Sequence, residues 1–293
     1  MPKKRLGNWN SPAGYHDYRA KYDAAMQDVP APDATYDIQT AYGTVRTYRF
    51  KSSATGLDPL VLLPGTSSGT PVWADNLESL LTITDVYALD LLGEPGMSVQ
   101  TEPITSDEDK AAWLDQTLAG LPEQRFNLLG LSIGGWTAMN LAVRRPDRIA
   151  TVTTVDAVNV YDGIPFAAIV RSLPAAIKWL PRSWRDSFNS YTAGGKPVER
   201  VPIADMIESG MKNYTIRQPP PRRITEQQLA ELPMPVLAII AGRSVMHDPA
   251  TARRTAETAL RTKTVAFYPD ASHAINGEYP DRIAADLRTF LNP

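Results

Sequence analysis

The chain of 293 residues contains no cysteine. Disulfide bonds, thiolate metal sites, a cysteine nucleophile and cysteine-held clusters are therefore excluded. Histidine is scarce as well, because only His16, His247 and His273 are present. Three imidazoles argue against a histidine-rich metal site, so we expect no bound metal.

The sequence also lacks a strong charge imbalance and a long hydrophobic run. Thirty Lys and Arg stand against thirty-two Asp and Glu, a net charge of −2, whereas nucleic acids and anionic membranes attract basic surfaces. No apolar run approaches the ~18 residues that a membrane span requires. The basic N-terminus continues into Gly, Asn and Pro, unlike a secretory signal. We therefore expect a cytoplasmic protein that binds neither nucleic acid nor membrane.

The chain instead alternates short apolar runs with amphipathic stretches. Residues 107–121 and 281–291 carry apolar side chains at helical spacing, and residues 36–50 form two alternating runs around Gly43, as in an antiparallel edge hairpin. Such alternation predicts an α/β protein with a mostly parallel central sheet and helices on both faces. The runs that predict buried strands are 59–63, 86–89, 126–129, 150–155, 236–240 and 264–268.

One long interval interrupts this alternation. About 75 residues separate Asp156 from Leu232, far more than a crossover between parallel strands needs. The interval is too apolar and aromatic for disorder, so it predicts a small helical cap inserted after the sixth strand. The predicted organisation is an N-terminal arm over 1–35, a core over 36–159 and 232–293, and a cap over 160–231.

A serine lies between a predicted strand and a predicted helix. Gly130, Ser132 and Gly134 form the pattern G-x-S-x-G directly after the run at 126–129. In this context the serine occupies a strained turn with its hydroxyl exposed, and the glycines let the strand and the helix approach. We therefore predict Ser132 as a nucleophile, with the backbone N–H of Ile133 at the helix N-terminus facing a developing oxyanion.

Two further loops carry residues that complement a serine nucleophile. The Gly- and Ser-rich loop after the run at 59–63 can supply a second oxyanion amide, which we assign to Thr66. His273 follows the last predicted strand, at the sheet edge where the serine lies. A general base must reach the nucleophile from that edge, so His273 is the predicted base.

These motifs together resemble the α/β-hydrolase fold, in particular its cap-bearing esterases, epoxide hydrolases and dehalogenases. The resemblance covers roughly 36–156 and 232–293, and it includes the loop at 90–98, similar to D-x-x-G-x-G-x-S with one extra residue, and the segment at 145–149. It implies a Ser-His-Asp triad that works without a cofactor.

The sequence departs from the family pattern at two places. The oxyanion loop normally reads His-Gly and here reads Pro64-Gly65, which leaves the backbone N–H available. The family usually places its acid three residues after the glycine that ends strand seven, where this chain has Val245. Asp156, at the end of strand six, and Asp248 remain as candidate acids. Asp248 before a proline is also a typical helix N-cap, so we favour Asp156.

The predicted function is hydrolysis of a carboxylic ester or similar acyl bond through an acyl-enzyme. The substrate is expected to be a small molecule, and the protein a monomer or homodimer. Two alternatives stay open from sequence. One is another chemistry of the same fold, such as C–C hydrolysis, lactone opening, perhydrolysis or acyl transfer. The other is a ligand-binding protein that has the triad residues but no activity.

Overall fold

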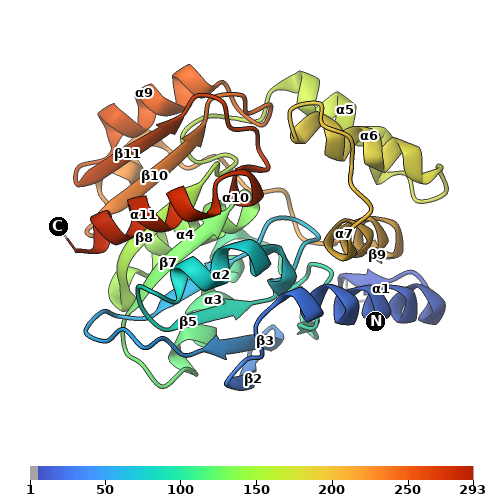
Figure 1. The fold of residues 1–293 in the computed structure, drawn as a ribbon, viewed down its shortest axis with the longest axis horizontal. Coiled ribbons are helices and arrows are strands. Elements are labelled where there is room, and N and C mark those ends of the chain that lie inside the picture. The colour runs from blue at the N-terminus through green and yellow to red at the C-terminus, as the bar shows by residue number, and fades with distance from the viewer. Residues whose placement is uncertain (1–5, 293) are drawn as a thin grey trace.

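The computed structural model describes residues 6–292, so the basic residues at 1–5 lie outside the described part. A nine-stranded sheet with the order β11-β10-β8-β7-β4-β5-β3-β2 runs through the molecule, and β6 pairs with β3 (Figure 1). The strands from β11 to β5 are parallel, whereas β3 pairs antiparallel with β2, β5 and β6. The strands are β2 (Ala34–Thr40), β3 (Gly43–Phe50), β4 (Leu60–Leu63), β5 (Val86–Leu89), β6 (Val99–Gln100), β7 (Phe126–Leu131), β8 (Ile149–Val155), β10 (Val236–Ala241) and β11 (Lys263–Tyr268).

Helices cover both faces of this sheet, which confirms the predicted fold class. One hydrophobic cluster joins the sheet to α3 (Asp107–Ala119), α4 (Ile133–Arg144) and α9 (Pro249–Ala259). A second cluster joins the opposite face to α2 (Ala74–Leu80), α10 (Ile275–Glu278) and α11 (Pro280–Leu291). Every residue of β4, β5, β7 and β10 is buried, because helices lie on both sides of these strands.

The long interval folds mainly into helices that lie beside the core. These are α5 (Phe166–Ala176), α6 (Arg182–Thr192) and α7 (Pro202–Asn213), on one side of the molecule in Figure 1. A buried ion pair between Arg185 and Glu208, at 2.7 Å, ties α6 to α7. The end of the interval differs from this group, because Ile224 and also Leu229, which lies in α8 (Glu226–Ala230), belong to the core cluster. From here on, the word cap refers only to α5, α6 and α7, which form part of the cap predicted over 160–231.

The N-terminal arm is attached to the cap. Strand β1 (Asn8–Trp9) pairs antiparallel with β9 (Tyr214–Thr215), directly after α7. Helix α1 (Pro12–Ala25) packs against α7, and Ser209 donates a hydrogen bond to Asp17 at 2.5 Å. Short 3-10 turns occur at Met26–Asp28, Thr70–Trp73 and Pro146–Arg148. Among residues 6–292, no helix combines the length and the apolar character needed to cross a bilayer.

Candidate active site

The register of the parallel strands brings five loops to one edge of the sheet. Leu63 of β4 pairs with Gly130 of β7, and Leu131 of β7 pairs with Val155 of β8. Val155 also pairs with Ile239 of β10, which is followed by β11 at the sheet edge. The loops that follow β4, β7, β8, β10 and β11 therefore open on the same side, where polar side chains from distant parts of the chain can meet.

Ser132 occupies a sharp turn between β7 and α4. Its backbone has φ 55° and ψ −117°, a conformation that non-glycine residues rarely adopt. The flanking glycines explain how the turn fits. A Cβ on Gly130 would lie 2.3 Å from the carbonyl oxygen of Gly134, and a Cβ on Gly134 would lie 2.0 Å from that of Leu63. Only glycine at both positions lets α4 start this close to β7 and β4.

We expect Gly134→Ala to destabilise the protein by about 1–3 kcal/mol, the usual cost of overpacking. The new Cβ would meet the backbone oxygens of Leu63 and Pro64, at 2.0 and 2.5 Å, and backbone cannot rotate away. Denaturant unfolding measures this loss of free energy. Gly163→Ala is the matched control, because a Cβ there meets nothing within 4 Å. Equal stability of the two variants would contradict the account of the turn.

A continuous chain of hydrogen bonds links Ser132 to His273 and to Asp156. The Oγ of Ser132 lies 2.9 Å from Nε2 of His273. The other ring nitrogen, Nδ1, lies 2.6 Å from Oδ2 of Asp156. Asp156 is fully buried, whereas the His273 side chain is 13% exposed. The three residues are separated by 24 and 117 positions in sequence (156 − 132 and 273 − 156), and the sheet edge brings them into contact.

The carboxylate of Asp156 accepts four hydrogen bonds. Oδ1 receives the backbone N–H of Ala241 at 3.0 Å and Nε2 of His247 at 2.8 Å. Oδ2 receives the hydroxyl of Ser244 at 2.6 Å and Nδ1 of His273. Burial alone would raise the pKa of Asp156, but the hydrogen bonds from the two histidines outweigh it and hold this pKa far below its usual value. Asp156 is therefore an ionised carboxylate in a buried site.

Asp248, the second candidate acid, lies at the start of α9 and makes different contacts from those of Asp156. Its Oδ1 accepts the backbone N–H of Thr251 at 2.7 Å, and Pro249 follows as the first residue of α9. The residue is exposed to solvent. The structure thus gives Asp248 the geometry of a helix N-cap, while Nδ1 of His273 is bonded to Asp156.

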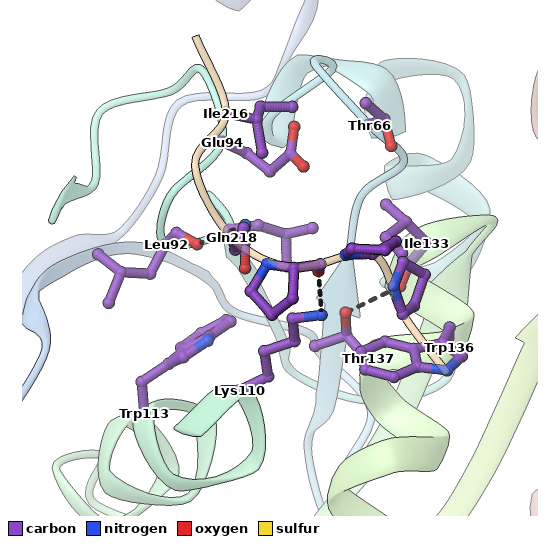
Figure 2. Close-up of a pocket in the computed structure, with 14 residues that line it drawn as sticks. Thr66, Leu92, Glu94, Lys110, Trp113, Ile133, Trp136, Thr137, Ile216 and Gln218 are labelled. Carbon is purple, nitrogen blue, oxygen red and sulfur yellow. Dashed lines mark hydrogen bonds between the residues drawn. The ribbon is translucent and has the colours of Figure 1, made fainter. Parts of the chain in front are cut away.

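The two residues predicted to supply oxyanion amides line one cavity. Ile133 is the first residue of α4, so its N–H has no acceptor within the helix. The loop after β4 runs beside the serine, since a Cβ on Gly65 would lie 3.8 Å from Cβ of Ser132. Thr66 and Ile133 both line the same cavity (Figure 2).

This cavity encloses about 170 Å³ and is mostly apolar. Figure 2 shows Thr66 and Ile133 on one side and Leu92 and Trp113 on the other. Lys110 forms part of its wall, where Nζ donates to the carbonyl oxygen of Pro219 at 2.7 Å and lies 4.7 Å from the ring centre of Trp136. The remaining lining residues are Leu91, Glu94, Thr137, Ile216, Gln218, Pro220 and Pro221. The cavity can hold a small apolar group beside Ile133, the residue that follows Ser132 in the chain.

Glu94 is a buried acid in the wall of this cavity. Its Oε2 accepts the backbone N–H of Ser67 at 3.2 Å, in the loop that also carries Thr66. Burial raises the pKa of Glu94 to about 7, although the Ser67 N–H and the charge of Lys110 oppose the rise. Between its ordinary value of 4.5 and about 7, the folded protein therefore binds a proton that the unfolded chain releases.

We expect the stability of the protein to fall as the pH rises through this window. The folded pKa lies above the unfolded one, so the free energy of unfolding decreases by about 3 kcal/mol between pH 4.5 and 7 through this group alone. Glu94→Gln, which cannot ionise, should lack this loss. Denaturant unfolding of both proteins at pH 5 and pH 8 measures the difference. The same decrease in both proteins would contradict burial of an ionising Glu94.

Two residues that contact Asp156 were not predicted from the sequence. His247 and Ser244 lie on the loop after β10, and neither has a sequence spacing that relates it to Asp156, 91 and 88 residues away. Their proximity follows only from the pairing of β10 with β8. Within residues 6–292, no group of three or more His, Asp or Glu side chains is placed to hold a metal ion.

Comparison with known proteins places the chain among hydrolases. The sequence model of the alpha/beta hydrolase family matches residues 60–286. The chain is 22% identical to an uncharacterized carboxylesterase, nap, of Bacillus subtilis (strain 168), over 94% of this chain and 92% of that protein. It is also 22% identical to carboxylesterase YbfK of the same organism, over 95% and 94%. The crystal structure of naproxen esterase from Bacillus subtilis superposes with a TM-score of 0.87 at 19% identity, covering 96% and 99%.

Proposed function

Because the chain belongs to the alpha/beta hydrolase family, we propose that it is a serine hydrolase that cleaves carboxylic esters. The observation that carries this proposal is the hydrogen-bonded series from Ser132 through His273 to Asp156, at 2.9 and 2.6 Å. A nucleophile, a base and an orienting carboxylate in this geometry are the apparatus for acyl transfer. Its carboxylesterase relatives, similar over nearly their whole length, support the same reaction class.

In the proposed reaction, Oγ of Ser132 attacks the ester carbonyl carbon while Nε2 of His273 takes the hydroxyl proton. Asp156 holds the imidazole in the tautomer with its proton on Nδ1 and stabilises the imidazolium that forms. The N–H groups of Ile133 and Thr66 hold the negative oxygen of the tetrahedral intermediate. His273 then gives the proton to the leaving alcohol.

In the second half of the reaction, water replaces the serine hydroxyl as the nucleophile. His273 removes a proton from a water molecule, which attacks the acyl group on Ser132, and the returning proton releases the serine. All steps use groups of this chain, and we assign no cofactor or metal to them. Asp248 is proposed to cap α9 and to take no part in the reaction.

The proposed substrate is a small ester with an apolar group that fits the cavity of about 170 Å³. Leu91, Leu92 and Trp113 provide an apolar surface near the two oxyanion amides. The cap of α5, α6 and α7 lies beside the same sheet edge, because the backbone N–H of His273 donates to the carbonyl of Thr192 at the end of α6. We propose that the cap helps to select the ester. The cytoplasmic location and the monomeric or dimeric state stay predictions.

A fluorophosphonate probe tests the proposal directly. An activated serine forms one covalent adduct with such a probe, and intact-mass measurement detects it. We expect one adduct on the native chain and none on Ser132→Ala, with hydrolysis of short-chain esters by the native chain only. A native chain that neither reacts nor hydrolyses an ester panel would instead support the ligand-binding alternative, in which the residues bind without catalysis.

A further inference from the structure

A second histidine contacts the acid of the proposed triad. His247 lies on the loop between β10 and α9, and its side chain is 2% exposed. Its Nε2 lies 2.8 Å from Oδ1 of Asp156, whereas His273 binds the other oxygen, Oδ2, at 2.6 Å. One buried carboxylate therefore binds a histidine through each of its two oxygens.

The chemistry of the pair fixes which group donates. An ionised carboxylate only accepts hydrogen bonds, so the proton of this contact must be on Nε2 of His247. This holds for the neutral ring and for the protonated ring alike. Among the described residues, Nδ1 of His247 is buried and has no hydrogen-bond partner. The contact with Asp156 is therefore the side-chain hydrogen bond of this imidazole.

The location of His247 adds to this argument. It belongs to the loop after β10, the loop from which the resemblance to the hydrolase family leads one to expect the acid itself. In this chain the acid is at the end of β8, and the loop after β10 supplies donors to it, from Ser244 and His247. Asp156 has a positive φ of 45°, so its side chain is presented from an unusual backbone position.

We propose that His247 is a positioning residue, which fixes the carboxylate of Asp156 so that Oδ2 stays directed at Nδ1 of His273. This inference rests on the proposed function, in which Asp156 orients His273. A carboxylate rotates about its Cβ–Cγ bond unless both oxygens are held. Ala241 and His247 hold Oδ1, and this restraint keeps the other oxygen aimed at His273.

Two variants of His247 separate hydrogen-bond donation from filling of space. His247→Phe fills the volume but has no donor, whereas His247→Gln keeps an N–H in a side chain that can reach Asp156. His16→Phe is the matched control, because His16 is exposed on α1. Should His247→Phe fail to fold, His247→Met supplies a smaller apolar side chain for comparison with the near-isosteric Gln.

We expect His247→Phe to lower kcat for a short-chain ester by about 10²-fold, the typical effect of a misplaced catalytic group, with little change in KM. His247→Gln should recover most of this loss, and His16→Phe should match the native chain. In an Asp156→Asn background, His247→Phe should add little, because both changes act on the same contact. Full kcat in a folded His247→Phe, or equal losses with Phe and Gln, would overturn the proposal.

A measurement that needs no turnover keeps this test apart from the test of the proposed function. The short bond between Nδ1 of His273 and Asp156 should give a strongly deshielded proton in the NMR spectrum, absent from His273→Ala. We expect this signal to shift or broaden in His247→Phe and to persist in His247→Gln and His16→Phe. If the chain hydrolyses no ester, the NMR result still decides whether His247 orients Asp156. An unshifted signal in His247→Phe would contradict it.

Discussion

Ser132→Ala is expected to lower kcat for ester hydrolysis by about 10⁶, as removal of the nucleophile does in a known triad enzyme. The variant retains the cavity and the proposed oxyanion amides of Ile133 and Thr66, but lacks the oxygen that is proposed to form the acyl-enzyme. Because alanine fits wherever serine fits, the fold should be unchanged. Steady-state kinetics on a short-chain ester measures the loss, and substrate binding to the inactive variant shows that the site is intact.

Ser79→Ala is a suitable control for this experiment. Ser79 lies on α2 on one face of the core, and its hydroxyl donates a hydrogen bond to the nearby carbonyl of Asn76. The activity of Ser79→Ala should equal that of the native chain. Undiminished hydrolysis by Ser132→Ala would exclude Ser132 as the nucleophile and with it the proposed mechanism.

Asp156→Asn is expected to lower kcat by about 10⁴, the effect of the same change in a known triad. An amide in place of the carboxylate carries no charge to stabilise the imidazolium. It also allows the wrong imidazole tautomer, with the proton on Nε2 facing Ser132. Kinetics at pH 8 measures the loss, and circular dichroism verifies that the buried amide has not unfolded the protein.

Asp248→Asn provides the comparison, because the sequence makes both Asp156 and Asp248 candidates for the acid that orients His273. Asn is as good a helix N-cap as Asp, so this variant should keep nearly full activity and stability. Asp248→Ala should cost about 1 kcal/mol of stability through loss of the bond to Thr251, with kcat unchanged. A loss of activity in Asp248→Asn larger than in Asp156→Asn would reverse the assignment of the acid.

Local patterns were sufficient to predict the framework of the fold. The run at 86–89 forms β5 over the same residues, and the helix expected from residue 107 begins at Asp107, with Ser106 as its N-cap in a capping box. These features depend on neighbours along the chain, through apolar periodicity and side-chain capping. The parallel sheet followed from them because strands that alternate with helices can pair in few other ways.

The preference for Asp156 over Asp248 as the proposed acid needed the tertiary structure. Asp156 ends a predicted strand and Asp248 precedes a predicted helix as its N-cap. Each has a local structural explanation, so the sequence left both open as the acid. The pairing of β8 with β10 brings Ala241 and His247 to one oxygen of Asp156. The four donors that surround this carboxylate come from residues 85 to 117 positions away, and no local pattern records such contacts.

The sequence by itself determined the type of fold, the serine at a strand–turn–helix junction and the histidine after the last strand, since these depend on residues that are adjacent in the chain. Only the tertiary structure decided which acid contacts His273, that His247 binds the same carboxylate, and that Glu94 is buried in the wall of the cavity. Contacts of this kind depend on the register of strands and on the exclusion of water, and both arise only when the whole sheet and its helices pack together.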